Sequence, residues 1–390
     1  MARKTIKKNM DFNLVEVIII ILITTLVVSV FSGLLVFNNY DKINSGLFHN
    51  TSDNIDLSEF IESYEHIIQN YVNEVEGSDL IDAAIAGMYN HLDDDYTMYL
   101  NKELTESLDE QLGGEYSGIG VEITMNENKD ILINRVFSDS PALEAGLKQG
   151  DMLIKLDGVD LSDKDSEYVA NTIKQSKKES FEVTYKRDGK ENTVTITRKR
   201  VYIDSVTSKE YGNVGYIQIE TFSGTTSKQI KNKLDDFSDN INSVVIDVRN
   251  NSGGYLSAAY EISDLFIEKG KNIYQLKDRN ENIKTFKAQF DVYRKFDKIA
   301  VLVNEYSASA SEILALALKE SADATIVGVK SYGKGSVQET NVLSSGAMVK
   351  YTTAYWLSPE GNSIDKVGIV PDIEVSKVEK QLDKALEAVK

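Results

Sequence analysis

The sequence predicts an α+β protein of several domains, in which an apolar amino-terminal segment and a helical region precede a mostly β module and an α/β core. The chain has 390 residues, more than one hydrophobic core usually holds. Short strands bounded by turn residues follow one another from about residue 113 to 200. From about residue 201, strands alternate with helices, which is typical of an α/β layer structure.

The amino-terminal segment has the pattern of a membrane anchor. Four basic residues within positions 1–13 precede an apolar stretch at 14–37, and its last 21 residues are uncharged. At roughly 1.5 Å rise per residue, a helix of this length spans a hydrocarbon layer about 30 Å thick. Because the basic side stays inside, we expect residues 1–13 in the cytoplasm and everything after Phe37 outside the cell membrane. Val30-Phe31-Ser32 loosely resembles a cleavage site, but the long apolar run favours a retained anchor.

A linker and a helical region follow, over residues 41–112. Residues 41–56 are polar, and from Leu57 to Val75 apolar residues recur at helical spacing. Gly77 breaks this pattern, and a second helical stretch runs from Ser78 to about Leu92. The apolar stripe must bury against something: either it packs on its own domain, or it forms a homodimer through these helices.

Composition excludes several classes of function. Lys and Arg number 43 against 61 Asp and Glu, so the net charge is −18 and a nucleic-acid partner is not expected. The chain has no cysteine and only three histidines, His49, His66 and His91. Any hydrolase chemistry in the later domains must therefore work without imidazole. No cluster of ligands has metal-site spacing, so we expect neither a metal nor an organic cofactor.

The mostly β module, residues 113–200, resembles a PDZ domain. The resemblance lies in a glycine loop directly before a strand and in a longer motif over residues 140–158; the loop residues are Gly118, Ile119, Gly120 and Val121. Such a loop can point backbone N–H groups at a terminal carboxylate while the strand edge pairs with the peptide. An ordinary hairpin turn is the alternative for the glycines alone. Lys174-Gln175 stands where relatives commonly carry an Arg-Gly pair.

The α/β core, residues 201–390, shows a regular alternation. Predicted strands are Val214–Phe222, Ser243–Val248, Ile299–Asn304 and Ala324–Val329, and predicted helices are Ser227–Phe237, Leu256–Ile267 and Ser309–Lys319.

A serine cluster and a later lysine are the candidates for chemistry in this core. Ser307, Ser309 and Ser311 lie between a predicted strand and helix, and Lys334 follows between two glycines. Without cysteine or a nearby histidine, a serine activated by a lysine is the simplest nucleophile. The lysine must then be buried enough to lower its pKa and leave it neutral.

Three ordinary readings compete with this one. Ser309 with Glu312 fits a capping box that merely starts a helix. The segment from Gly328 to Lys334 nearly matches a phosphate-binding loop, but Gly335 stands where a Ser or Thr is needed and the following residues look extended. Lys334 also fits a solvated turn.

Taken together, the motifs resemble the carboxyl-terminal processing proteases, also called tail-specific proteases. The resemblance covers about residues 60–375 and includes the segments 95–100, 247–254 and 368–372, besides the serine and lysine motifs and the PDZ-like module. Two prolines often seen in relatives are replaced, by Asp95 and Ser252. The resemblance implies a crotonase-like or ClpP-like layered protease core.

The resemblance also implies roles for individual residues. Ser309 matches the nucleophile, Lys334 the general base and Gln338 a residue that positions the lysine, while the backbone N–H groups of Ala310 and Gly254 match the oxyanion hole. We therefore expect a membrane-anchored, outward-facing serine endopeptidase that binds protein carboxyl termini in its PDZ domain. A non-catalytic PDZ scaffold that collects protein tails at the membrane is the alternative.

Overall fold

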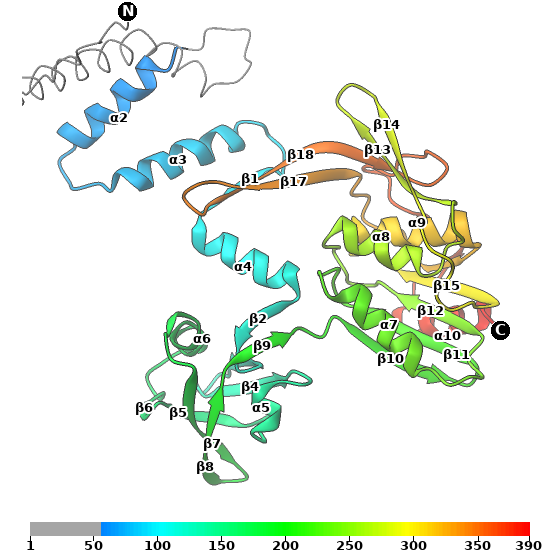
Figure 1. The fold of residues 1–390 in the computed structure, drawn as a ribbon, viewed down its shortest axis with the longest axis horizontal. Coiled ribbons are helices and arrows are strands. Elements are labelled where there is room, and N and C mark those ends of the chain that lie inside the picture. The colour runs from blue at the N-terminus through cyan, green and yellow to red at the C-terminus, as the bar shows by residue number, and fades with distance from the viewer. Residues whose placement is uncertain (1–55) are drawn as a thin grey trace, which may run out of the picture. The chain divides into compact units, whose positions relative to one another are not determined.

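The computed structural model describes residues 56–390 (Figure 1). The described residues divide into two units, one that ends at Leu80 and one over Ile81–Lys390. The predicted anchor at residues 14–37 and the linker up to residue 55 lie outside the described residues. Among the helices of residues 56–390, none combines the length and the hydropathy of a bilayer-spanning segment.

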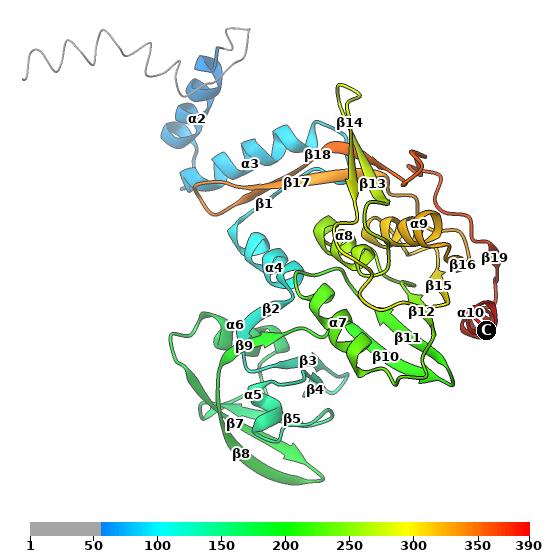
Figure 2. The same cartoon turned by 45° about the vertical axis from the view of Figure 1, so that its right-hand side comes forward.

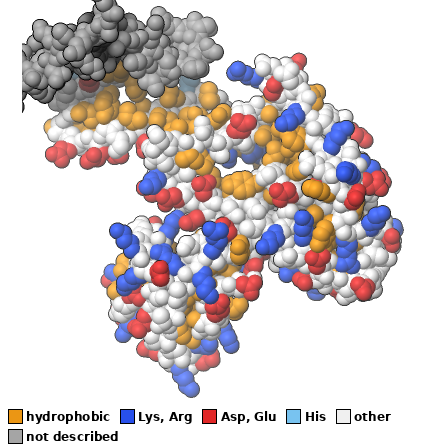
Figure 3. Space-filling model, in the orientation of Figure 1, with side chains coloured by type: hydrophobic (Ala, Val, Ile, Leu, Met, Phe, Trp, Pro, Cys, Tyr) orange, Lys and Arg blue, Asp and Glu red, His pale blue; other side chains and the backbone are white. Residues whose placement is uncertain are grey.

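Two helices begin the described part: α2, Ser58–Asn70, and α3, Gly77–Asn90. The predicted stripe from Leu57 to Val75 is thus divided, because α2 ends at Asn70 and the backbone is already extended at Tyr71. Neither helix contains a buried residue, and Figure 3 shows hydrophobic side chains gathered along α3. Several large apolar side chains are exposed here: Leu57, Phe60, Ile61, Ile67, Ile68 and Met88.

The β module contains one sheet of strand order β3-β4-β5-β7-β8, with β6 paired to β5. Its strands are β3 Val121–Met125, β4 Ile131–Val136, β5 Met152–Leu156, β6 Val159–Asp160, β7 Ser180–Arg187 and β8 Lys190–Thr197. Helices α5, Pro141–Glu144, and α6, Ser166–Gln175, complete the module. The predicted hairpin at Asp188-Gly189 is confirmed, since both residues have positive φ between the paired strands β7 and β8.

The two ends of this module lie side by side. Strand β2, Glu115–Gly118, pairs antiparallel with β9, Lys199–Tyr202, and the N–H of Ile203 donates to the carbonyl of Gly114. The chain therefore enters and leaves the module through one short two-stranded ribbon. Helix α4, Lys102–Gly113, precedes the ribbon and was not predicted. Asn101 caps this helix, and Gly114 ends it in the left-handed conformation.

The core is built on a six-stranded sheet of order β10-β11-β12-β15-β16-β19, in which all neighbours except β10 and β11 are parallel. The strands are β10 Val206–Tyr211, β11 Val214–Ile219, β12 Ser243–Asp247, β15 Lys298–Val303, β16 Thr325–Gly328 and β19 Ile373–Glu374. The four predicted strands and three predicted helices of this region are confirmed within a few residues.

Helices cover both faces of this sheet (Figure 2). One face packs against α7 Thr226–Asp236, α8 Leu256–Asp264 and α9 Ala310–Ala322, and the other against α10 Val378–Ala388. Successive residues of β12 serve opposite faces: Val244 and Ile246 belong to the first core and Val245 to the second. Burial on both faces explains the continuous apolar runs of the parallel strands.

A second sheet has the order β1-β18-β13-β14, with β17 also paired to β18. These strands are β1 Met98–Leu100, β13 Asn272–Asp278, β14 Ile283–Lys287, β17 Ser336–Val342 and β18 Met348–Leu357. Most of them were not predicted, because their side chains are only partly buried and the period-2 signal is weak. Strand β1 lies beside β18 in both views, which brings the 95–100 motif to the lysine segment (Figures 1 and 2).

Candidate active site

Ser309 stands at the amino end of α9, directly beyond the carboxyl end of the central strand β15. It has φ 54° and ψ −115°, a backbone conformation that a residue with a side chain rarely adopts. Strain of this kind persists only where the surroundings impose it, and it occurs often at functional sites. The amino end of the helix also presents the positive end of its dipole.

The structure distinguishes Ser309 from the two neighbouring serines. Ser307 and Ser311 are completely buried, whereas Ser309 is half-buried. The hydroxyl of Ser307 donates to the carbonyl of Val248 at 2.8 Å, and that of Ser311 donates to the carbonyl of Asn251 at 2.8 Å. Both hydroxyls therefore hold the loop that follows β12, and Ser309 alone of the three is accessible to a substrate.

The glycine loop after β12 lies against Ser309. At Gly253, φ is 111°, and a Cβ atom would lie 3.0 Å from the Cβ of Ser309 and 3.2 Å from the nitrogen of Ala310. Its N–H donates to Asn251 at 2.8 Å. By contrast, within residues 56–390 neither the N–H of Gly254 nor that of Ala310 donates a hydrogen bond. Two free backbone donors thus belong to the two segments that meet at Ser309.

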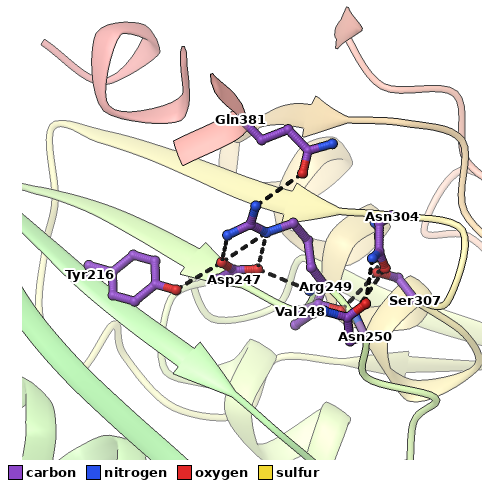
Figure 4. Close-up of polar contacts among 8 residues, drawn as sticks. All are labelled: Tyr216, Asp247, Val248, Arg249, Asn250, Asn304, Ser307 and Gln381. Atoms are coloured by element: carbon purple, nitrogen blue, oxygen red, sulfur yellow. Dashed lines mark hydrogen bonds and ion pairs between the residues drawn. The ribbon is translucent and has the colours of Figure 1, made fainter. Parts of the chain in front are cut away.

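A buried polar network holds the start of the glycine loop, at the end of β12 (Figure 4). Asp247 is fully buried and pairs with Arg249, whose Nη2 lies 2.5 Å from Oδ2. Tyr216 donates to the same oxygen at 2.8 Å, and Arg249 Nη1 donates to Gln381 of α10 at 3.0 Å. Burial raises the pKa of the Tyr216 phenol, which stays a donor. Because each charge is paired, the ion pair tolerates its burial.

Asn250 and Asn304 join the glycine loop to the end of β15. Asn250 has φ 59°. Its N–H donates to Oδ1 of Asn304 at 2.8 Å, and Nδ2 of Asn304 donates back to Oδ1 of Asn250 at 2.8 Å. This reciprocal pair, drawn in Figure 4, couples the glycine loop directly to the segment that leads into Ser309.

Glu312, in the first turn of α9, connects the serine segment to the lysine segment. Its side chain is completely buried. One oxygen accepts from the hydroxyl of Ser331 at 2.6 Å and the N–H of Gly333 at 2.7 Å. The other accepts from the N–H groups of Ser309 and Lys334, both at 2.9 Å. Burial raises the pKa of the Glu312 carboxyl, and these hydrogen bonds oppose that shift.

The capping contact expected between Ser309 and Glu312 is present, since the Glu312 carboxylate accepts from the N–H of Ser309, but Glu312 does more than start a helix. The same carboxylate also binds backbone N–H groups 21 and 22 residues away along the chain. Sequence reasoning did not identify this second function, because the capping pattern explained the glutamate completely.

Lys334 is partly buried, and both positively and negatively charged side chains lie near its amine. Burial, and after it the nearby ammonium of Lys350 on β18, lower the pKa of its amine against the opposing effect of Asp94 and Glu312, and the resulting pKa is about 8. Its Nζ lies 4.0 Å from the centroid of the Tyr96 ring. The solvated-turn reading of Lys334 does not fit these surroundings. A substantial neutral fraction near pH 8 is what a lysine base requires.

Gln338, on β17, lies next to this lysine segment. Its Nε2 donates to Oγ of Ser336 at 2.9 Å and to Oγ1 of Thr352 on β18 at 3.1 Å. Among the described residues, no hydrogen bond joins Lys334 Nζ to Gln338 or to Ser309 Oγ. The expected contacts of the lysine remain predictions; catalytic hydrogen bonds are often long before substrate binds.

The β module carries a separate groove beside its glycine loop. A cavity of about 190 Å³ is bounded by Gly118, Ile119 and Val121, by apolar side chains of α6, and by the pair Lys174–Glu110 at 3.1 Å. Tyr116 also lines this cavity; burial raises its phenol pKa to about 12, and the backbone N–H groups of Gly120 and Val121 oppose the rise. These N–H groups thus face the phenol oxygen of Tyr116.

No group of three or more His, Asp and Glu side chains in residues 56–390 is arranged to hold a metal ion.

Three family descriptions match successive parts of the chain. Residues 31–104 match the activating protease CtpB N-terminal domain, residues 117–197 match a PDZ domain, and residues 213–375 match peptidase family S41. Fold and site together therefore define a serine peptidase that carries a PDZ domain.

Relatives define the family more closely. A "Probable CtpA-like serine protease" of Staphylococcus aureus (strain MSSA476) is 33% identical over 91% of this chain and 71% of its own length. The protein of the same name from Staphylococcus haemolyticus (strain JCSC1435) is 33% identical over 86% of this chain and 68% of its own. A solved photosystem II D1 C-terminal processing protease is 26% identical, with a TM-score of 0.47, over 85% of this chain and 95% of its own.

The chain belongs to the carboxyl-terminal processing proteases of peptidase family S41. It is accordingly a serine-type endopeptidase, and the scaffold alternative is set aside.

Replacing Glu312 by glutamine tests the connection between the two segments. Glutamine offers one acceptor oxygen, so its amide nitrogen must face either Ser331 and Gly333 or Ser309 and Lys334. We expect kcat/KM of Glu312→Gln to fall by about 100-fold, which is typical of a small displacement of reacting groups. Peptide cleavage measures the fall.

The matched control is Glu305→Gln, the same change at an exposed position of the loop before Ser309. The single tryptophan, Trp356, reports folding of the core, because it is 1% exposed and its Nε1 donates to the carbonyl of Lys334 at 2.8 Å. Native Trp356 emission together with unchanged activity in Glu312→Gln would show that the carboxylate has no such role.

Proposed function

We propose that Ser309 is the nucleophile and Lys334 the general base of a peptide-cleaving dyad, with Gln338 positioning the lysine. The observation that carries this proposal is the combination of an accessible serine at a helix amino end with a lysine whose pKa burial lowers to about 8. Glu312 ties the backbones of both residues to one carboxylate. The family membership supports the same assignment.

The reaction would proceed through an acyl-enzyme. Neutral Lys334 takes the proton of the Ser309 hydroxyl as the oxygen attacks the scissile carbonyl carbon, and a C–O bond forms. The oxyanion accepts hydrogen bonds from the free N–H groups of Ala310 and Gly254. As the C–N bond breaks, the lysine gives its proton to the departing amine. Water then attacks the ester carbonyl carbon as Lys334 takes a proton from the water. As the C–O bond to Ser309 breaks, the lysine gives that proton to the serine oxygen, which releases the acid product and restores both the hydroxyl and the neutral amine.

The titration of Lys334 predicts the pH dependence. Below a pKa of about 8 the amine is protonated and has no lone pair to accept the serine proton. We therefore expect kcat/KM to rise with pH through a limb near 8 and to be lost in acid. Ser309→Ala and Lys334→Ala should each lower the rate by at least about 10³-fold.

The matched control is Lys330→Ala, which removes an exposed lysine four residues earlier. Full activity of Lys334→Ala, or a pH profile that is flat between 6 and 9 in the unaltered chain, would refute the lysine base.

We further propose that the groove beside Gly118-Ile119-Gly120-Val121 receives the carboxyl terminus of the substrate protein. Its apolar lining suits a terminal side chain, and its backbone N–H groups suit a carboxylate. Hydrogen bonds to a charged group contribute about 1.5–3 kcal/mol, or roughly 10- to 100-fold in affinity. The PDZ match supports this assignment.

A pair of peptides tests this groove. Amidation of the terminal carboxyl should raise KM by about tenfold or more, because it removes the charge that the loop binds. Acetylation of the amino terminus of the same peptide is the matched control and should leave KM unchanged. Equal kcat/KM for free and amidated tails would contradict the proposal.

We propose that residues 14–37 anchor the protease in the cell membrane, with residues 1–13 in the cytoplasm and the catalytic part outside. The apolar run and its basic leader support this arrangement.

The exposed apolar side chains of α2 and α3 support a homodimer through these helices, for which light scattering would give twice the chain mass. Domain limits at 41–112, 113–200 and 201–390 complete the proposal.

Cell fractionation tests the anchor. The full chain should remain with membranes after alkaline carbonate washing, and a chain without residues 1–37 should not. Recovery of the full chain, uncut by mass, in the soluble fraction would refute the anchor.

A further inference from the structure

The segment before β1 holds a carboxylate that the proposed mechanism does not use. Oδ2 of Asp94 accepts from Oγ1 of Thr97 at 2.7 Å and from Oγ1 of Thr352 at 2.6 Å, and Oδ1 accepts from the N–H of Tyr96 at 3.1 Å. Thr352 lies on β18, 258 residues along the chain from Asp94. The N–H of Thr352 in turn donates to Oγ1 of Thr97 at 3.2 Å. These contacts fix the carboxylate on the second sheet, beside the lysine segment.

The hydrogen bonds of Asp94 determine which way the amide of Gln338 points. An ionised carboxylate only accepts, so the single proton of the Thr352 hydroxyl is given to Asp94. The hydroxyl oxygen can then only accept from its other neighbour, Gln338, at 3.1 Å. The NH₂ group of Gln338 must therefore face Thr352. Its carbonyl oxygen, which accepts no hydrogen bond within residues 56–390, remains available to an N–H of Lys334.

Asp94 also acts on Lys334 through its charge. The groups that face this amine come from several elements: Asp94 and the ring of Tyr96 from the segment before β1, Glu312 from α9, and Lys350 from β18. The phenol of Tyr96 donates to the phenol oxygen of Tyr332 at 3.3 Å, and Asp95 and Asp365 lie near it. Of the two carboxylates that attract the ammonium form of Lys334, Asp94 has the larger effect, and it also attracts Lys350.

We propose that Asp94 is a positioning residue of the active site, which orients the Gln338 amide through Thr352 and supplies the negative charge that attracts the ammonium form of Lys334. The inference rests on the proposed function, because both effects matter only if Lys334 and Gln338 serve the reaction. It gives Asp94, which directly precedes the 95–100 motif, an indirect part in the reaction from a position more than 200 residues before the nucleophile.

The variant Asp94→Asn separates the two effects. An asparagine can donate from its NH₂ group to the Thr352 hydroxyl oxygen. The hydroxyl proton is then free to point at Gln338, so the Gln338 amide is no longer forced to turn its NH₂ group toward Thr352. We expect kcat at the alkaline plateau to fall by about 10- to 100-fold, as for small misplacements of reacting groups, with KM nearly unchanged. Loss of the attractive charge favours neutral lysine, so the acid limb should move to lower pH than the limb near 8 of the unaltered chain.

Three further variants serve as controls. Asp93→Asn makes the same change one residue earlier, at an exposed position with φ 51° that asparagine tolerates, and should leave the profile unchanged. Thr352→Val removes the hydroxyl but keeps the Asp94 charge. It should therefore lower kcat at the alkaline plateau without changing the pH of the acid limb. Thr352→Ser restores the hydroxyl and should recover most of the plateau. Trp356 emission verifies the fold of each variant.

If the acid limb of the activity profile of Asp94→Asn lies at the same pH as in the unaltered chain, the inference is overturned, whatever the value of kcat at the alkaline plateau. A carboxylate with a merely structural role can lower activity, but it does not move the pH at which Lys334 titrates. If Asp94→Asn does not fold, equal plateaus for Thr352→Val and Thr352→Ser would overturn it. Failure of the proposed function is a separate outcome: in that case Lys334→Ala or Ser309→Ala retains activity, irrespective of Asp94.

Discussion

The active site depends on one buried carboxylate. Glu312 is inaccessible to solvent, and its two oxygens accept four hydrogen bonds, which come from the segment that carries Ser309 and from the segment that carries Lys334. Neither segment belongs to regular structure at these points, so the carboxylate replaces the backbone partners that a helix or sheet would provide. A buried charge is stable only when its hydrogen bonds are complete, and this requirement makes the arrangement sensitive to the position of each loop.

The pKa of the Lys334 amine results from several opposing effects and not from one neighbour. Burial and Lys350 lower the pKa of the amine, whereas Asp94 and Glu312 raise it, and the result is about 8. Full desolvation without carboxylates would leave the amine neutral but too weak a base to accept a serine proton. Stronger pairing would keep it protonated. The intermediate value allows the same nitrogen to accept a proton and later return it.

Rigidity on the opposite side of Ser309 has a different origin. The glycine loop is held by buried serine hydroxyls, by the reciprocal pair of Asn250 and Asn304, and by the ion pair of Asp247 and Arg249 that reaches α10 through Gln381. Sequence reasoning identified the glycines, since positive φ and close approach leave a recognisable residue type. It did not identify the supporting side chains, because serine, asparagine and arginine occur at many positions for many reasons.

What the sequence by itself determined was local or repetitive. The alternating strands and helices of the core, the Asp188-Gly189 turn, and the serine and lysine motifs were predicted because their signals lie within a few residues of each other. The tertiary structure decided which of three serines is accessible, that Glu312 binds two loops, and that Asp94 lies beside Lys334. These contacts join residues tens to hundreds of positions apart, and such proximity arises only when sheets and helices pack, so no local pattern encodes it.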